Sequence, residues 1–188
     1  MVEDTCHARC KEMLEKARLT AKVGILEKAM DDLGCKLPES FFKCSTCEPN
    51  EAIIGGFVTD AEKDRQVVVC EDNVAKFHIS QSHVDKTVAH ELIHAYDHCR
   101  ANIDWSNCLH IACAEVRAAN LSGDCHMTSE IDRMNLGIRG QGAKCVRRRA
   151  LLSVQAHPEC TAIAKQALEQ VFDGCYKDRS PFISKMDY

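Results

Sequence analysis

The sequence lacks three features, and each absence excludes a class of protein. No apolar run approaches the 18 residues of a membrane-spanning helix, so no transmembrane segment is expected. The formal net charge of −4 provides no general attraction to nucleic acid, so no nucleic-acid partner is expected. The acidic N-terminus has neither the apolar region of a secretory signal nor an arginine-rich amphipathic leader, so neither kind of targeting segment is expected.

The length and the overall composition are those of an ordinary globular protein. The chain has 188 residues, of which 45% are hydrophobic and 28% are charged. A chain of this length can build a substantial hydrophobic core. We therefore expect a single domain over residues 1–188, with short flexible ends at about 1–6 and 180–188.

Cysteine is unusually abundant. Thirteen cysteines spread over the whole chain indicate a disulfide framework, and their odd number leaves at least one thiol unpaired. Such a framework without a signal peptide indicates an oxidising compartment reached by an unusual route, or a redox-active intracellular protein. The alternative for Cys44 and Cys47, which are spaced C-x-x-C, is a second zinc site with Cys35 or Cys70.

The segment Thr87–Asp97 contains the motif H-E-x-x-H. On a helix, His90 and His94 project from one face and can hold a single Zn²⁺. Glu91 is then placed to take a proton from a zinc-bound water. The other residues between Thr87 and Tyr96 are uncharged, as a buried active-site helix requires, because further charges there would lose their hydration. The motif predicts a zinc-dependent peptidase, with Glu91 as the catalytic residue.

A catalytic zinc site needs a third protein ligand beyond the two histidines. The extended metzincin motif is absent, because it requires a glycine at Asp97 and a ligand at Arg100. We expect Glu115, on the next predicted helix, to be the third ligand. His110 is the main alternative, and His98 or Asp97 fit less well.

Several neighbouring residues have two possible roles. Asp97 either accepts a hydrogen bond from a ligand imidazole or is an ordinary surface carboxylate. Arg117 pairs with the neighbourhood of Glu115, stabilises an oxyanion or lies at the surface, and Tyr96 is expected in the core. The basic run Arg147–Arg149 is either a solvated helix face or a contact with acidic lipid headgroups.

Hydrophobic spacing and turn residues predict the order of the elements. An amphipathic helix over residues 7–33 ends at Gly34, a cysteine-bearing loop covers 35–50, and strands at 52–58 and 66–70 form a hairpin. Helices are expected at 84–100, 108–121, 125–136, 143–156 and 160–175. The equal spacing of Cys145, Cys160 and Cys175 suggests a helical hairpin stapled at its ends.

These elements predict a helix-dominated α+β fold. The short hairpin or sheet is expected beside the metal helix, where a zinc peptidase holds an extended peptide by main-chain hydrogen bonds. With Glu115 as the third ligand, the fold would be zincin-like, of the gluzincin type.

Three blocks of sequence closely resemble one known family. They are H-E-L-I-H-A-Y-D at 90–97, D-W-x-N at 104–107 and H-x-A-C-x-E-V-R-A-A-N-L-S-G-D-C at 110–125. This chain resembles the mitochondrial inner-membrane metalloprotease family of ATP synthase assembly, also described as Ku-binding-protein-like, over residues 6–182. Two positions depart from the family pattern: Ala114, where serine often precedes the glutamate, and Ile111, where a second histidine is common.

The resemblance implies a zinc-dependent endopeptidase of the mitochondrial intermembrane space, in peripheral contact with the inner membrane. Its polypeptide substrate would be the precursor of ATP synthase subunit six, and it would assist assembly of the proton channel. His90 and His94 match the family's zinc ligands, and Glu91 matches its catalytic glutamate. Oxidative import in this family would explain many cysteines without a presequence.

Two other functions compete with the endopeptidase. One is an assembly chaperone with dispensable proteolysis, although a structural metal site has no use for the general base Glu91. The other is a nuclear metalloprotease associated with DNA repair, which the acidic net charge and the many cysteines oppose.

Overall fold

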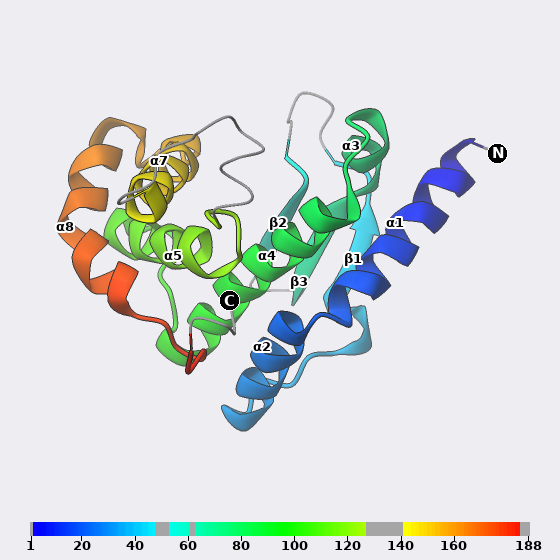
Figure 1. Cartoon of the computed structure of the whole chain (residues 1–188), viewed down its shortest axis with the longest axis horizontal. Helices are drawn as coiled ribbons and strands as arrows, with labels where there is room; N and C mark the ends of the chain where they lie inside the picture. Colours follow the sequence, from blue (N-terminus) through cyan, green and yellow to red (C-terminus); the bar gives the residue numbers. More distant parts are fainter. Residues whose placement is uncertain (1, 48–52, 61–62, 127–140, 185–188) are drawn as a thin grey trace. The chain divides into compact units, whose positions relative to one another are not determined.

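The computed structural model describes residues 2–47, 53–60, 63–126 and 141–184 (Figure 1). Within these ranges the fold is α+β and dominated by helices, as predicted, with a small sheet. The chain divides into two compact units, unit 1 over residues 1–100 and unit 2 over residues 101–188. The single domain expected from the chain length stays a prediction.

The N-terminal part of unit 1 contains two helices, α1 (Val2–Arg18) and α2 (Ala21–Asp32). The prediction of one helix over residues 7–33 was therefore wrong. The break occurs at Thr20, whose backbone is extended and whose hydroxyl donates a hydrogen bond to the Ala17 carbonyl at 2.7 Å. Threonine side chains compete in this way with the backbone hydrogen bonds of a helix. Here α1 ends before Thr20, and the second helix, α2, begins after it.

The predicted stop at Gly34 is confirmed. Gly34 has a φ of +83°, a conformation that costs a glycine little because it has no Cβ. The amide of Cys35 donates to the Met30 carbonyl at 2.9 Å, and the Gly34 amide donates to the Asp31 carbonyl at 2.8 Å. These two hydrogen bonds form a Schellman motif, which caps the end of α2.

The sheet of unit 1 has the order β1-β3-β2, with β1 at Phe42–Ser45, β2 at Gly55–Asp60 and β3 at Lys63–Cys70. β2 and β3 are antiparallel, so the predicted hairpin is confirmed. β1 pairs with β3 in parallel, which corrects the expectation of a loop over 35–50. A strand of four residues carries little local signal, and its pairing depends on a partner distant in sequence. A 3₁₀ turn, η1 (Glu39–Phe41), leads into β1.

Two helices follow the sheet in unit 1. α3 (Glu71–Lys76) is short and packs with α1 and β1. α4 (Gln81–Ala101) contains the predicted metal helix and extends it slightly at both ends. The buried side chains of α4 are mainly apolar: Val84, Val88, Ala89, Leu92, Ile93, Ala95 and Tyr96.

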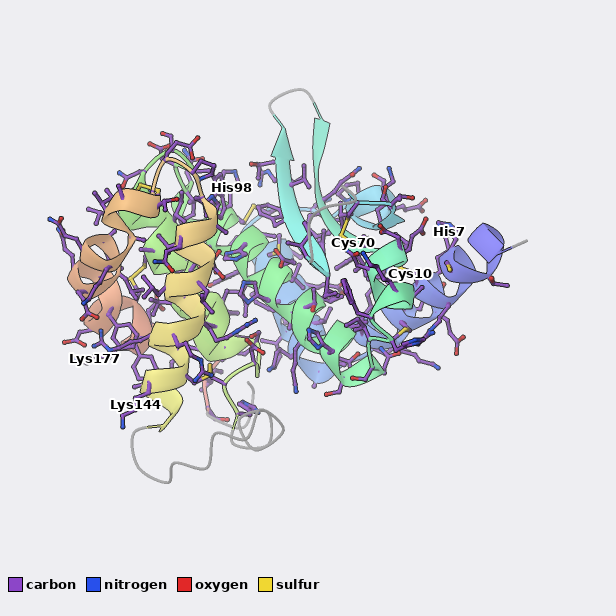
Figure 2. All side chains as sticks on the ribbon, turned by 90° about the horizontal axis from the view of Figure 1, so that it is seen from above. His7, Cys10, Cys70, His98, Lys144 and Lys177 are labelled. Atoms are coloured by element: carbon purple, nitrogen blue, oxygen red, sulfur yellow. A yellow bond between two sulfur atoms is a disulfide. The ribbon has the colours of Figure 1, made fainter. Side chains whose placement is uncertain are left out.

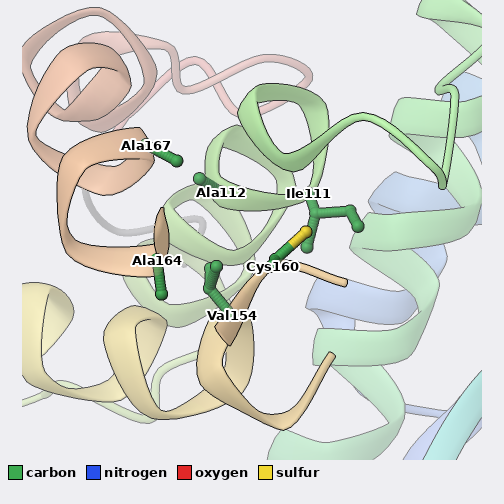
Figure 3. Packing of buried hydrophobic residues seen from close by; sticks show 6 residues of the cluster. All are labelled: Ile111, Ala112, Val154, Cys160, Ala164 and Ala167. Carbon is green, nitrogen blue, oxygen red and sulfur yellow. The ribbon is translucent and has the colours of Figure 1, made fainter. Parts of the chain in front are cut away.

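The described part of unit 2 contains three packed α-helices, α5 (Cys108–Leu121), α7 (Gln141–Ala156) and α8 (Ala164–Lys177). Asn107 caps α5 by accepting a hydrogen bond from the Leu109 amide at 2.9 Å. A 3₁₀ turn, η2 (Thr161–Ile163), precedes α8. The helix predicted at 125–136 falls mostly outside the described residues. Figure 3 shows small and branched side chains closing one part of the core: Ile111, Ala112, Val154, Cys160, Ala164 and Ala167.

All thirteen cysteines lie in the described residues, and twelve of them form disulfides. Cys6 is the free thiol, as the odd count predicted. Cys44 pairs with Cys10 and Cys47 pairs with Cys70, so the alternative of a zinc site that Cys44 and Cys47 share with Cys35 or Cys70 was wrong. The remaining bridges are Cys35–Cys99, Cys108–Cys160, Cys113–Cys175 and Cys125–Cys145.

The predicted staple of α7 to α8 through Cys145, Cys160 and Cys175 is also corrected. Each of these cysteines pairs with a residue from the segment 108–125, so the bridges tie α7 and α8 to α5 and to the turn after it. Equal spacing along the chain does not bring these three sulfurs together, because each faces α5 or its C-terminal turn rather than the other two.

The basic run of α7 is engaged within unit 2. Arg147 pairs with Glu169 at 2.6 Å, and its guanidinium lies 3.5 Å from the centroid of the Phe172 ring. Arg149 pairs with Asp124 at 2.5 Å. These contacts favour a structural role for the two arginines over a lipid-binding one. Within the described ranges, no helix combines the length and apolar character required to cross a bilayer.

Candidate metal centre

The two histidines of the motif lie side by side on α4. Their ring centroids are 4.8 Å apart and the ring planes are inclined by 79°. His94 is 5% exposed, whereas His90 is half-buried and accessible. The i, i+4 spacing thus places both imidazoles on one face of the helix, as the motif predicted. This pair can bind one metal ion while leaving a side of the ion open.

Glu91 lies next to His90 on the same helix and is half-buried. β2 passes close to it, because a Cβ built on Gly55 would lie 3.9 Å from Glu91 Cγ. The strand predicted beside the metal helix is therefore present in unit 1. Strand β2 forms an edge of the sheet in the described part of the chain, and an edge strand is the position at which an extended peptide can add by main-chain hydrogen bonds.

Gly55 allows β2 to approach α4 this closely. This glycine was not identified from the sequence. A Cβ there would lie 2.8 Å from Thr87 Cγ2 and 2.8 Å from the Val68 carbonyl oxygen. A glycine inside a strand is the sequence signal for such an approach.

We expect Gly55→Ala to destabilise the protein by about 1–3 kcal/mol, because the backbone of β3 must move to accept the methyl group. Chemical unfolding measures this loss. Gly56→Ala is the matched control, since a Cβ at Gly56 meets nothing within 4 Å. Equal stability of the two variants would contradict the close approach of Gly55 to the Val68 carbonyl and to Thr87.

The other polar residues of α4 have structural contacts. Asp97 is 1% exposed and pairs with Arg100, with an Nε–Oδ1 distance of 2.9 Å. It is therefore not a surface carboxylate. His98 packs against the Phe57 ring, with centroids 6.2 Å apart, and Tyr96 is buried as predicted.

In unit 2, Glu115 lies on the buried side of α5. Its side chain is 7% exposed, and its helical neighbours Ile111, Ala112 and Val116 are almost fully buried. A carboxylate in such a place requires partners that compensate for its lost hydration, and a metal ion is one such partner.

His110, the alternative ligand, has a different environment. It is exposed, and its Nδ1 accepts a hydrogen bond from the Asp104 amide at 3.2 Å. Hydrogen bonds from the Ser106 hydroxyl and amide lower the pKa of Asp104. His110 thus stabilises the turn that precedes α5.

Arg117 is not a surface residue. It is 1% exposed and pairs with the Asp178 carboxylate at 2.8 Å. It also donates hydrogen bonds to the carbonyls of Asp178 and Ser180. Arg117 therefore fixes the segment that follows α8, a role for which the sequence carries no local signal.

Comparison with known proteins identifies relatives over nearly the whole chain. The family model described as the Peptidase M76 family matches residues 4–183. A protein named mitochondrial inner membrane protease ATP23 homolog from Homo sapiens is 41% identical over 182 residues, which cover 95% of this chain and 70% of that protein.

Two further relatives are also named as mitochondrial inner membrane proteases. The Xenopus laevis protein is 41% identical, with 93% of this chain and 72% of the relative covered. The Schizosaccharomyces pombe protein is 34% identical, with 84% of this chain and 81% of the relative covered. No solved structure matches the chain.

Proposed function

The chain belongs to the Peptidase M76 family and is related to mitochondrial inner membrane proteases, and from this we propose that it is a zinc-dependent endopeptidase with the active site on α4. The single observation that carries the proposal is the pair of adjacent imidazoles, His90 and His94, with Glu91 beside them. A structural metal site has no need of the glutamate, whereas hydrolysis requires a base at that position.

Within this proposal each residue of the motif has a separate task. His90 and His94 hold the metal ion through their imidazole nitrogens. Zinc, when bound, activates a water molecule and polarises the scissile carbonyl. Glu91 accepts the proton of the attacking water and then delivers it to the nitrogen of the leaving amine. The edge of β2 aligns the substrate peptide by main-chain hydrogen bonds.

We propose Glu115 as the third ligand, which would make the site zincin-like and of the gluzincin type. Two imidazole nitrogens and one carboxylate oxygen are a common donor set of catalytic zinc sites. Support comes from the burial of Glu115 on α5, where a carboxylate requires a partner that compensates for its lost hydration.

Glu115→Ala is expected to weaken zinc binding by more than about 100-fold, beyond the 10–100-fold typical of a residue that only orients a ligand. Competition with a chromophoric chelator measures the affinity. His110→Ala is the matched control on the same helix and should leave zinc affinity unchanged, at a cost of about 0.5–1.5 kcal/mol in stability. The reverse pattern would assign the ligand role to His110.

The purified protein is expected to hold one zinc ion per chain at this site, and His90→Ala combined with His94→Ala is expected to remove it. Elemental analysis of the folded protein measures the stoichiometry. His83→Ala provides a control, because His83 is exposed at the start of the same helix. Unchanged metal content in the double variant would contradict the assignment of the site.

We further propose that the protein works in the intermembrane space, peripheral to the inner membrane, on the precursor of ATP synthase subunit six, and that it assists proton-channel assembly. The names of the relatives and the six disulfides support this placement. Incubating the precursor with purified protein tests the substrate. Release of the N-terminal extension by the wild type, but not by Glu91→Gln, is the expected result.

A further inference from the structure

A second group of metal-binding side chains lies in unit 1, where α1, β1 and α3 pack together. It consists of Cys10 on α1, Cys44 on β1 and Glu71 at the start of α3. One ligand atom from each of the three lies within 4.8 Å of the other two. Figure 2 labels Cys10 on α1 and Cys70, the residue that precedes Glu71.

His7 extends this group. Its Nδ1 lies 2.5 Å from Glu71 Oε2, and it is placed one turn before Cys10 on α1 (His7 is labelled in Figure 2). A histidine that is hydrogen-bonded to one oxygen of a carboxylate fixes the orientation of the carboxylate, an arrangement found around metal ligands. The packing of α1, β1 and α3 places the His7–Glu71 pair next to the Cys10–Cys44 bridge.

We propose that Cys10, Cys44 and Glu71 form a redox-controlled site for a thiophilic divalent cation such as Zn²⁺, which binds when the Cys10–Cys44 disulfide is reduced. His7 positions Glu71, and a water molecule takes the fourth position. The site shares no residue with the motif on α4, so the proposal is independent of the peptidase function.

The geometry requires little movement. Two thiolates at about 2.3 Å from a tetrahedral zinc ion are about 3.8 Å apart, whereas disulfide sulfurs are about 2.0 Å apart. The sulfurs must therefore separate by about 1.8 Å, which side-chain rotation can supply. Cys10 is fully buried and Cys44 is 6% exposed, so the three elements already surround the position of the ion. The metal would replace the disulfide as the clamp between α1 and β1.

Conversion of the disulfide form to the zinc-binding form requires a reductant, and a dithiol supplies the electrons and protons. The dithiol transfers two electrons to the Cys10–Cys44 bond and becomes a disulfide, and its two protons pass to the two cysteine sulfurs. Binding of the cation then releases both protons to solvent, because the ligands are thiolates.

The test uses the full chain carrying His90→Ala and His94→Ala, so that the candidate catalytic site binds no metal. The protein is reduced with a dithiol, desalted without air, and treated with iodoacetamide in the presence or absence of one equivalent of Zn²⁺. Peptide mapping by mass spectrometry measures the alkylation rate of every cysteine. We expect zinc to slow alkylation of Cys10 and Cys44 by at least about 10-fold, whereas Cys108 and Cys160 serve as internal references.

Two variants in the same background separate a built site from adventitious binding by thiols. Glu71→Gln retains all thirteen cysteines and should abolish the selective protection, whereas Glu159→Gln, an exposed substitution, should retain it. His7→Ala should weaken zinc binding by about 10–100-fold. Equal protection of all cysteines, protection that survives Glu71→Gln, or a reduced chain that unfolds and shows no protection would each overturn the proposal.

Discussion

Replacing Glu91 by glutamine is expected to lower peptide cleavage by at least about 100-fold while the zinc ion stays bound. Glutamine retains the size and much of the hydrogen bonding of glutamate, but it cannot accept a proton at neutral pH. Because His90 and His94 are untouched, the metal content should match that of the wild type. Cleavage of the subunit six precursor and elemental analysis of the same preparation measure the two effects.

The matched control is Glu159→Gln, which makes the same chemical change at an exposed position of unit 2. Its activity should equal that of the wild type. Full cleavage by Glu91→Gln would place water activation elsewhere. If Glu91→Gln loses cleavage but still supports assembly of the proton channel, the assembly role does not depend on proteolysis, and the chaperone function gains support.

Removal of the Cys113–Cys175 bridge by alanine at both positions is expected to destabilise the protein by about 4 kcal/mol. The bridge closes a loop with a sequence separation of 62 residues, and a cross-link over such a loop greatly restricts the unfolded chain. For a protein of this size the loss corresponds to a fall in melting temperature of about 8–16 °C. Thermal unfolding under non-reducing conditions measures the change.

Cys6→Ala is the control for this variant, because Cys6 is the cysteine without a bridge. It should change stability by no more than about 0.5 kcal/mol. Counting the thiols of natively trapped protein provides a separate check: one free thiol is expected, and ten or more would contradict both the disulfide framework and the placement in an oxidising compartment.

The sequence by itself determined the features that depend on local physics. The spacing of His90 and His94 placed both on one helix face, because an α-helix repeats every 3.6 residues. Gly34 ended α2, because a glycine readily adopts a positive φ. The turn between two apolar runs predicted the β2–β3 hairpin, and the helix over 108–121 was placed correctly. The number of cysteines predicted a disulfide framework.

Only the tertiary structure decided the features that depend on partners distant in sequence. The parallel pairing of β1 with β3 and the partner of every cysteine follow from which elements pack together, and short sequence windows do not contain that information. Arg117 is buried because the segment after α8 supplies carbonyls and a carboxylate for its guanidinium. The break between α1 and α2 at Thr20 was also not predictable from the apolar spacing, which continues through residues 7–33. A side-chain hydrogen bond from Thr20 and the packing of the two helices end α1 there.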